Sequence, residues 1–252
     1  WYNPIKGHAQ YSLRDERRDR QSGRIWRVVP KGAPLSDPLQ IAGASVRQLV
    51  TLLERPEYRY RYWAKRELRE RDSEEVQVAL DRWVRQLRRQ DERFRHHQVE
   101  GLWLYRNMGL VNTRLMEELL DCENQYARAA AARQLRYWFR DLQEPYKALA
   151  GAAVDESGLV RMEAVIAASY IGTRAALESV LPVLNAPAEG NLQYAIATAF
   201  GAEKLARHWR GETQIGRYPE LAVFYAAFGK ASKQKAGRTT LSATESAFDN
   251  QK

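Results

Sequence analysis

One short phrase recurs along the 252-residue chain. Consecutive copies begin 36, 31, 33 and 31 residues apart. The clear copies are Arg61-x-x-Ala64-x-x-x-Leu68, Arg128-x-x-Ala131-x-x-x-Leu135 and Arg161-x-x-Ala164-x-x-x-Ala168, and weaker copies begin at His97 and Leu192. A period of this length indicates a solenoid of stacked helix pairs, since a single pair cannot bury its apolar face alone. The small residue permits close helix approach, and the apolar residue four positions later shares its face.

Apolar residues follow a helical period from residue 44 onward, and turn residues divide this stretch. Asp72 with Glu75 is a candidate capping box, and Pro145 suits a first helical turn. Helices joined by short turns form antiparallel pairs. We therefore expect an all-α solenoid of about five pairs, with a partial sixth beginning near Tyr218. The expected pairs cover residues 44–70, 73–107, 112–140, 144–171 and 173–208.

The two ends of the chain differ from this repeat region. Residues 1–40 are rich in Pro and Gly, and Gly23–Val29 has the composition of a short strand with no partner strand nearby. We expect it to complete a sheet elsewhere, and the start at Trp1 indicates a processed chain or a fragment. The expected organisation is an extended segment at 1–40, helical repeats at 41–210, a terminal helix or partial repeat at 211–229, and a polar linker or tail at 230–252.

The charge balance favours acidic partners. Forty Lys and Arg against 31 Asp and Glu give a net charge of +9, which suits nucleic acid, anionic lipid or acidic proteins. Bases and carboxylates alternate over residues 66–95, which favours a solvated face over a phosphate-binding stripe. No apolar run approaches the roughly 20 residues of a transmembrane helix.

No catalytic constellation accompanies the repeats. His96, His97 and Glu100 are a weak metal candidate without a further ligand at matching spacing, so a buried or capping role for one histidine and solvent exposure for the other are preferred. The only cysteine, Cys122, is interpreted as a structural thiol. The alternating Tyr58-Arg-Tyr-Arg-Tyr62 suits stacking on nucleic acid, and equally suits arginine stems packed over rings.

The phrases Asp121…Tyr126-Ala-Arg128 and Asp155-Glu-Ser-Gly-Leu-Val-Arg161 resemble HEAT repeats. The resemblance covers about residues 44–210 and implies a HEAT-like α-solenoid. In that family a turn Asp and an Arg that opens the second helix stack into a ladder between neighbouring repeats. The resemblance therefore implies a structural ladder made of Arg61, Asp121, Arg128, Asp155 and Arg161.

A second resemblance involves the first residues of the chain. The segments Trp1-Tyr-Asn-Pro-Ile-Lys-Gly-His8 and Gly23-Arg-Ile-Trp-Arg-Val28 are similar to the closing segment of a bacterial β-propeller. That propeller belongs to the PQQ- and sorbosone-type membrane-bound dehydrogenases, in which HEAT repeats and then a cytochrome c or cupredoxin-like domain follow. The residues that carry the resemblance to the propeller junction are Trp1, Tyr2, Asn3, His8, Arg18, Asp19, Arg24 and Trp26.

This second resemblance implies a non-catalytic scaffold within a periplasmic or extracellular redox protein. Its partners would be the propeller, an electron-carrier domain or a neighbouring subunit. Haem c or a quinone cofactor is expected only on neighbouring domains, since one cysteine cannot supply the haem-attachment pattern Cys-x-x-Cys-His. The alternative is a nucleic-acid-binding HEAT protein similar to the alkylpurine glycosylases, with Glu100 near Trp103 as the acidic residue beside an aromatic ring. Whether the polypeptide is part of an enzyme stays open.

Overall fold

The computed structural model describes residues 28–32, 39–210 and 216–229, and the chain divides into units 1–39 and 40–252. In the first unit the described segment 28–32 is irregular and ends in a turn. The expected strand over 23–29 lies mostly outside the described residues. Its two described members, Val28 and Val29, are exposed and belong to no strand.

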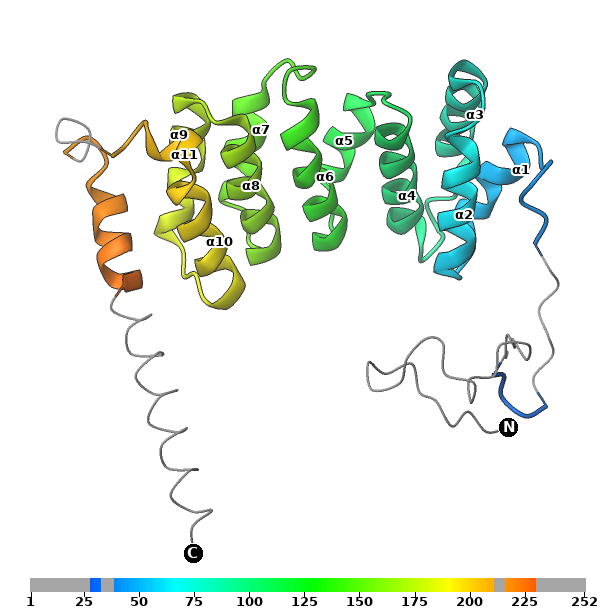
Figure 1. Ribbon diagram of the computed structural model, residues 1–252, viewed down its shortest axis with the longest axis horizontal. Coiled ribbons are helices and arrows are strands. Elements are labelled where there is room, and N and C mark those ends of the chain that lie inside the picture. The colour runs from blue at the N-terminus through cyan, green and yellow to red at the C-terminus, as the bar shows by residue number, and fades with distance from the viewer. Residues whose placement is uncertain (1–27, 33–38, 211–215, 230–252) are drawn as a thin grey trace, which may run out of the picture. The chain divides into compact units, whose positions relative to one another are not determined.

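The second unit is a row of helix pairs, as Figure 1 shows. The first helices of the pairs are α1 (Val46–Thr51, continued by the 3-10 turn Leu52–Glu54), α3 (Ser73–Gln86), α5 (Thr113–Leu120), α7 (Pro145–Ala153) and α9 (Arg174–Val180, continued by the 3-10 turn Leu181–Asn185). The second helices are α2 (Tyr58–Leu68), α4 (Phe94–Asn107), α6 (Gln125–Trp138), α8 (Gly158–Ile171) and α10 (Gly190–Gly201). Each expected pair contains its two helices. The prediction of an all-α, HEAT-like solenoid of about five pairs is confirmed.

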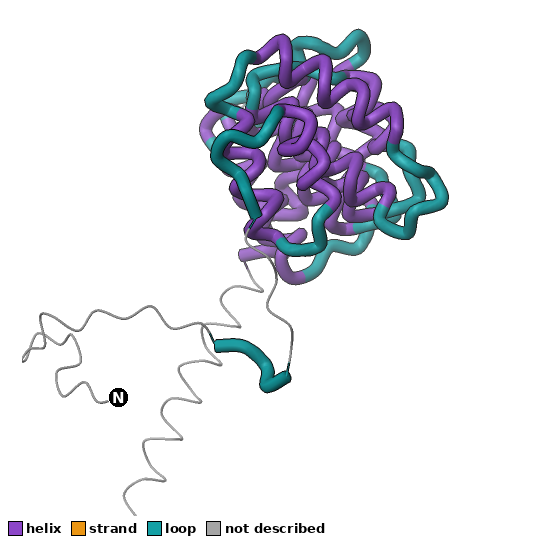
Figure 2. Tube along the Cα trace, turned by 90° about the vertical axis from the view of Figure 1, so that its right-hand side faces the viewer, coloured by secondary structure: helices purple, strands orange, loops and turns teal. Residues whose placement is uncertain are grey.

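The row ends in a short helix α11 (Glu203–Ala206) and a helix over 219–229, drawn in orange in Figure 1. The last helix packs on the repeat region, since the Tyr225 hydroxyl donates to the Ala197 carbonyl and its ring stacks on Trp209 with centroids 5.2 Å apart. Figure 2 views the row from the end at which α1–α3 lie, and the part of the chain that the structure describes contains no strand.

Local signals explain where the helices begin. Ser45 and Gln48 form a complete capping box at α1, with the Ser45 amide donating to Gln48 Oε1 at 2.9 Å. Asp72 caps α3 by accepting from the Glu75 amide at 2.9 Å, but Glu75 returns no bond within the described chain, so only half of the expected box forms. Pro145 occupies the first turn of α7, as expected.

The recurring phrase lies at the centre of the core. Its small and large apolar positions are fully buried in three second helices: Ala64 and Leu68 in α2, Ala131 and Leu135 in α6, and Ala164 and Ala168 in α8. Helix α8 packs against both α6 and α10. The core is one continuous cluster that extends from α1 to Leu221. The repeats therefore share an apolar seam, as the spacing predicts.

Candidate interaction surface

Three arginines at equivalent repeat positions hold the turns between helices. In each case Nη1 donates to the two carbonyls that lie six and five residues earlier in the chain. The acceptors are Arg55 and Pro56 for Arg61, Cys122 and Glu123 for Arg128, and Asp155 and Glu156 for Arg161, at 2.7 to 3.1 Å. These carbonyls sit just before a helix, where backbone groups lack helical partners. The arginine therefore fixes the angle at which each second helix leaves its turn.

Arg128 also links its repeat to the next one. Its Nε and Nη2 donate to the two carboxylate oxygens of Asp155 at 2.8 and 3.0 Å. Asp155 in turn accepts from the Ser157 amide at 2.8 Å. This bidentate geometry is the strongest form of an arginine–carboxylate pair. It raises the pKa of Arg128, chiefly through the hydrogen bonds to Asp155.

The other two arginines reach the next repeat by different acceptors. Arg61 Nε donates to Glu100 Oε1 at 2.8 Å, and Glu100 belongs to helix α4, not to a turn. Arg161 Nη2 donates to the Pro187 carbonyl at 3.2 Å, and its Nε has no partner in the described chain. Four of the five expected ladder residues thus take part in such links, although only one link joins a turn aspartate to an arginine.

Asp121 is the exception, and its position explains why. Asp155 lies six residues before Arg161, whereas Asp121 lies seven residues before Arg128. The equivalent position is Cys122, and the exposed Asp121 meets no arginine among the described residues. The turn aspartate that does share the geometry of Asp155 is Asp91, which accepts from the Arg93 amide at 2.8 Å. The sequence contains a signal for Asp91: it lies six residues before His97, as Asp155 lies six residues before Arg161.

Glu100 is buried at the centre of an ion cluster. Its side chain is 2% exposed, and its two oxygens accept from Arg61 Nε and from Lys65 Nζ, the latter at 2.6 Å. His96 Nε2 lies 3.6 Å from the same carboxylate. Each oxygen is paired with a cation and the side chain is enclosed, which disfavours a role as a general base beside Trp103.

The two histidines occupy desolvated positions. Burial lowers the pKa of His96, against the opposing effect of Glu100, and burial likewise lowers the pKa of His97. Both side chains therefore favour the neutral form at neutral pH. Within the described ranges, no three His, Cys, Asp or Glu side chains gather as metal ligands. Cys122 is buried, and burial raises the pKa of its thiol.

A second buried carboxylate, Glu163, lies between α6 and α8. One oxygen accepts from Arg133 Nη2 at 2.6 Å and the other accepts from Arg136. The Glu163 side chain is 3% exposed, whereas that of Arg133 is 52% exposed. The two arginines therefore cover the acid, and Arg133 presents its charge outward, whereas the Arg136 side chain is only 11% exposed. Sequence reasoning did not single out Glu163. The sequence signal for Glu163 was its position directly before the small core residue Ala164, where a carboxylate needs a cationic partner.

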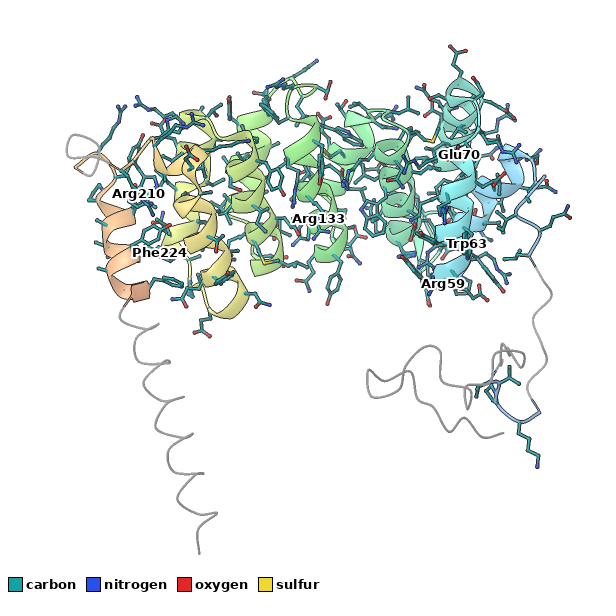
Figure 3. All side chains as sticks on the ribbon, viewed as in Figure 1. Arg59, Trp63, Glu70, Arg133, Arg210 and Phe224 are labelled. Atoms are coloured by element: carbon teal, nitrogen blue, oxygen red, sulfur yellow. The ribbon has the colours of Figure 1, made fainter. Side chains whose placement is uncertain are left out.

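Arginine guanidinium groups lie over aromatic rings along the second helices. Arg66 lies 5.2 Å from the ring centroid of Trp63, and Arg106 lies 3.9 Å from that of Tyr137. Arg136 lies 5.1 Å from the Tyr170 ring. Figure 3 shows two residues of these second helices, Trp63 on α2 and Arg133 on α6. Pairs of this kind stabilise by about 0.5–1 kcal/mol where they are exposed, and they hold the guanidinium in place.

The segment Tyr58–Tyr62 is partly self-packed. Tyr58 and Tyr62 stack with centroids 6.1 Å apart, and Arg55 lies 5.6 Å from the Tyr60 ring. The rings of this segment therefore pack on one another, whereas neither of its own arginines, Arg59 and Arg61, lies over a ring among the described residues. The expected propeller-junction residues all lie outside the described residues, and these are Trp1, Tyr2, Asn3, His8, Arg18, Asp19, Arg24 and Trp26.

Residues 112–201 match the family model of HEAT repeats. No curated protein and no solved structure gives a significant match to the chain. The matched segment comprises α5 to α10, in which the Arg128–Asp155 pair occurs. Among the described residues, no helix has both the length and the apolar character needed to cross a membrane.

Proposed function

We propose that the helical unit is a non-catalytic scaffold that presents an extended surface to protein partners. The observation that carries this proposal is the continuous core, which runs through all five pairs and is reinforced by arginines that bridge the repeats. Stacked repeats of this kind have large exposed faces and no need of a catalytic centre. Protein interaction is a common role of HEAT repeats, which the match over residues 112–201 supports.

The finer proposal is that this scaffold connects the domains of a periplasmic or extracellular redox protein. The phrases over residues 1–28 that resemble the end of a β-propeller support it, because they directly precede the repeats. A propeller and a cytochrome c or cupredoxin-like domain would then carry the quinone and haem chemistry. The repeats would fix the distance between these domains.

Two measurements test this connection: the intact mass of the native protein, and the extension of the open reading frame upstream and downstream of this sequence. A polypeptide that also contains a propeller before the repeats and an electron carrier after them is the expected result. A native protein with neither neighbour, and no tightly associated subunit that supplies them, would contradict the redox proposal. The scaffold role would be unaffected.

The charge of the second helices supports one alternative, a nucleic-acid-binding HEAT protein. Ten basic residues lie in α2, α4, α6, α8 and α10 against three acidic ones. Duplex binding at physiological salt tighter than the roughly 10⁻⁴–10⁻⁶ M of non-specific association would favour it. The enclosure of Glu100 by Arg61 and Lys65 argues against a glycosylase-like reaction at that residue.

A further inference from the structure

We propose that the exposed face of the second helices binds an acidic protein segment, with carboxylates over α2 to α6 and apolar side chains over α8 and α10. This inference rests on the interaction role proposed above and is independent of the redox context. The face is defined by one stripe on each second helix. Its exposed members are Arg59, Trp63, Arg66, Arg106, Arg133, Tyr137, Tyr170 and Tyr194.

These residues occupy equivalent positions in the repeats. Counted from the first residue of the recurring phrase, they lie at −2, +2, +5 and +9, a spacing of four, three and four residues. Positions with this spacing form one stripe on a helix. The buried phrase residues at 0, +3 and +7 form the stripe that faces the core. The repeat therefore places these exposed side chains on one side of the second helices. The same positions are buried at Val99 and Leu102 in α4, at Glu163 in α8 and at Ala197 in α10.

The two sides of the unit differ in charge. The first helices α1, α3, α5, α7 and α9 carry six basic and six acidic residues. The second helices carry ten basic and three acidic residues, and these acids are Glu67, Glu100 and Glu163. All three acids already pair with cations. An approaching partner therefore meets positive charge that no free carboxylate on these helices offsets.

Several arginines of this face have no carboxylate of their own. Within the described residues, Arg66 and Arg106 make ring contacts only, and Arg59 makes no polar contact. Arg66 and Arg106 are held against Trp63 and Tyr137, so their donors stay directed although neither makes an ion pair among the described residues. Such preorganised guanidinium groups are suited to bidentate binding of carboxylates.

The character of the face changes along the row. Helices α8 and α10 contain only one basic residue, Arg161, which is occupied with the turn carbonyls. Their exposed members are instead Tyr170 and Tyr194, which are 55% and 66% exposed. Next to Tyr170, the half-buried Ile166 continues the apolar part. The face is thus basic and aromatic at one end, and at the other end it carries tyrosine rings and few charges.

This gradient discriminates between two kinds of acidic partner. A nucleic acid carries the same charge at every step, so the loss of positive charge over α8 and α10 matches no change along its backbone. A protein segment can place Asp and Glu at one end and apolar side chains at the other. The observed distribution therefore favours the protein segment.

Fluorescence anisotropy with the full chain tests the proposal at physiological salt. The probe is a short labelled peptide with Asp and Glu in one half and Leu and Phe in the other. A peptide of equal charge without apolar residues and a single-stranded DNA of equal charge serve as comparisons. We expect the mixed peptide to bind most tightly of the three.

Matched variants locate the site. Arg66→Glu with Arg106→Glu should weaken binding of the mixed peptide about tenfold, because two attractive contacts become repulsive. The control is Arg82→Glu with Arg114→Glu, which makes the same charge change at exposed positions of α3 and α5. This control should change affinity less than about twofold. Tyr170→Ser with Tyr194→Ser should weaken only the mixed peptide, and Val78→Ser on α3 is its control.

Three results would overturn the proposal. The first is equal weakening by the two charge-reversal pairs, which would indicate non-specific attraction. The second is tighter binding of the DNA, which would establish the nucleic-acid alternative. The third is no binding of the mixed peptide by a chain whose thermal unfolding is intact. If the charge-reversal pair fails to fold, Arg66→Gln with Arg106→Gln replaces it. None of these results bears on whether the native polypeptide includes redox domains, which the intact mass decides separately.

Discussion

The first two repeats and the later ones have the same helix-pair geometry but are held together by different chemistry. Between α6 and α8 the link is an arginine with a turn aspartate, Arg128 with Asp155, and alanines line the interface. Between α2 and α4 the link is a buried cluster of Arg61, Lys65 and Glu100. The model of HEAT repeats matches only residues 112–201, which contain the first kind of link.

The packing differs in the same way. In α4, Glu100 takes the place of the usual alanine, and the glycine that follows it allows the close approach: a Cβ on Gly101 would lie 3.1 Å from Val84 and 3.2 Å from Trp83. In α6, Ala131 and Ala132 are fully buried among other alanines. The repeat therefore requires two things: helices that approach closely, and an arginine that binds the next repeat. Several combinations of side chains satisfy both requirements. A family pattern based on one combination does not detect the others.

The largest expected effect distinguishes the two buried carboxylates. Glu100→Gln should lower the free energy of unfolding by about 3–5 kcal/mol, since it leaves two buried cations without a counter-charge. Glu163→Gln should cost less, about 2–3 kcal/mol, because it leaves one buried cation, Arg136, without a counter-charge while the half-exposed Arg133 can be hydrated again. Urea unfolding followed by circular dichroism measures both. Equal losses would show that the early repeats do not depend more strongly on their ion cluster.

The next effect compares the arginines of the later repeats. Arg128→Ala removes bonds to two turn carbonyls and to Asp155, and should cost about 2–3 kcal/mol. Arg161→Ala removes carbonyl bonds only and should cost about 1–2 kcal/mol. The same urea titration applies, with Arg114→Ala as an exposed control. Unchanged stability in Arg161→Ala would contradict the structural role of the whole arginine series.

Two glycines allow a smaller comparison. Gly109 and Gly172 both have φ near +70°, a conformation that L side chains rarely adopt. A Cβ at Gly109 would meet no atom within 4 Å, whereas a Cβ at Gly172 would lie 2.8 Å from Lys204 Cβ. Gly109→Ala should therefore cost about 1 kcal/mol and Gly172→Ala about 1–2 kcal/mol. Thermal unfolding gives the difference. A larger loss of stability for Gly109→Ala than for Gly172→Ala would mean that the close contact of Gly172 with Lys204 on α11 adds no cost.

Sequence reasoning predicted the helix pairs well and their links only partly. The pairs follow from a phrase whose apolar positions recur at a fixed spacing, and burial of Ala64, Ala131 and Ala164 is what that spacing requires. The partner of Arg61 could not be found in this way, because Glu100 occupies the position that Ala fills in other repeats. A carboxylate there is stable only with Lys65 beside it, and that contact depends on how two helices pack.

The exposed stripe was hidden for a related reason. Over residues 66–95 bases and acids alternate in sequence, which predicts a solvated face of mixed sign. Most of those acids belong to α3 and its flanking loops, whereas Arg66 belongs to α2. Only the assignment of residues to first and second helices separates the charges into a neutral side and a basic side. The spacing of residues along the chain carries no such information by itself.

The smallest effect concerns the boundary between the two kinds of repeat, where Arg95 bridges to Glu123 through Nη2 and Oε2 at 2.9 Å. Hydrogen bonds from Arg95 lower the pKa of Glu123 from its ordinary value of 4.5 to about 2. Because the folded-state pKa is depressed, any stabilisation by this pair is present above pH 4.5 and is lost as the pH falls toward 2. Carboxyl NMR titration should show this low value, and in Arg95→Ala the pKa of Glu123 should return toward 4.5.

The Glu123 side chain is 74% exposed, so added salt should weaken this pKa shift while leaving the enclosed Glu100 cluster nearly unaffected. A shift that is insensitive to salt would mean that the boundary is as well protected from solvent as the repeats on either side.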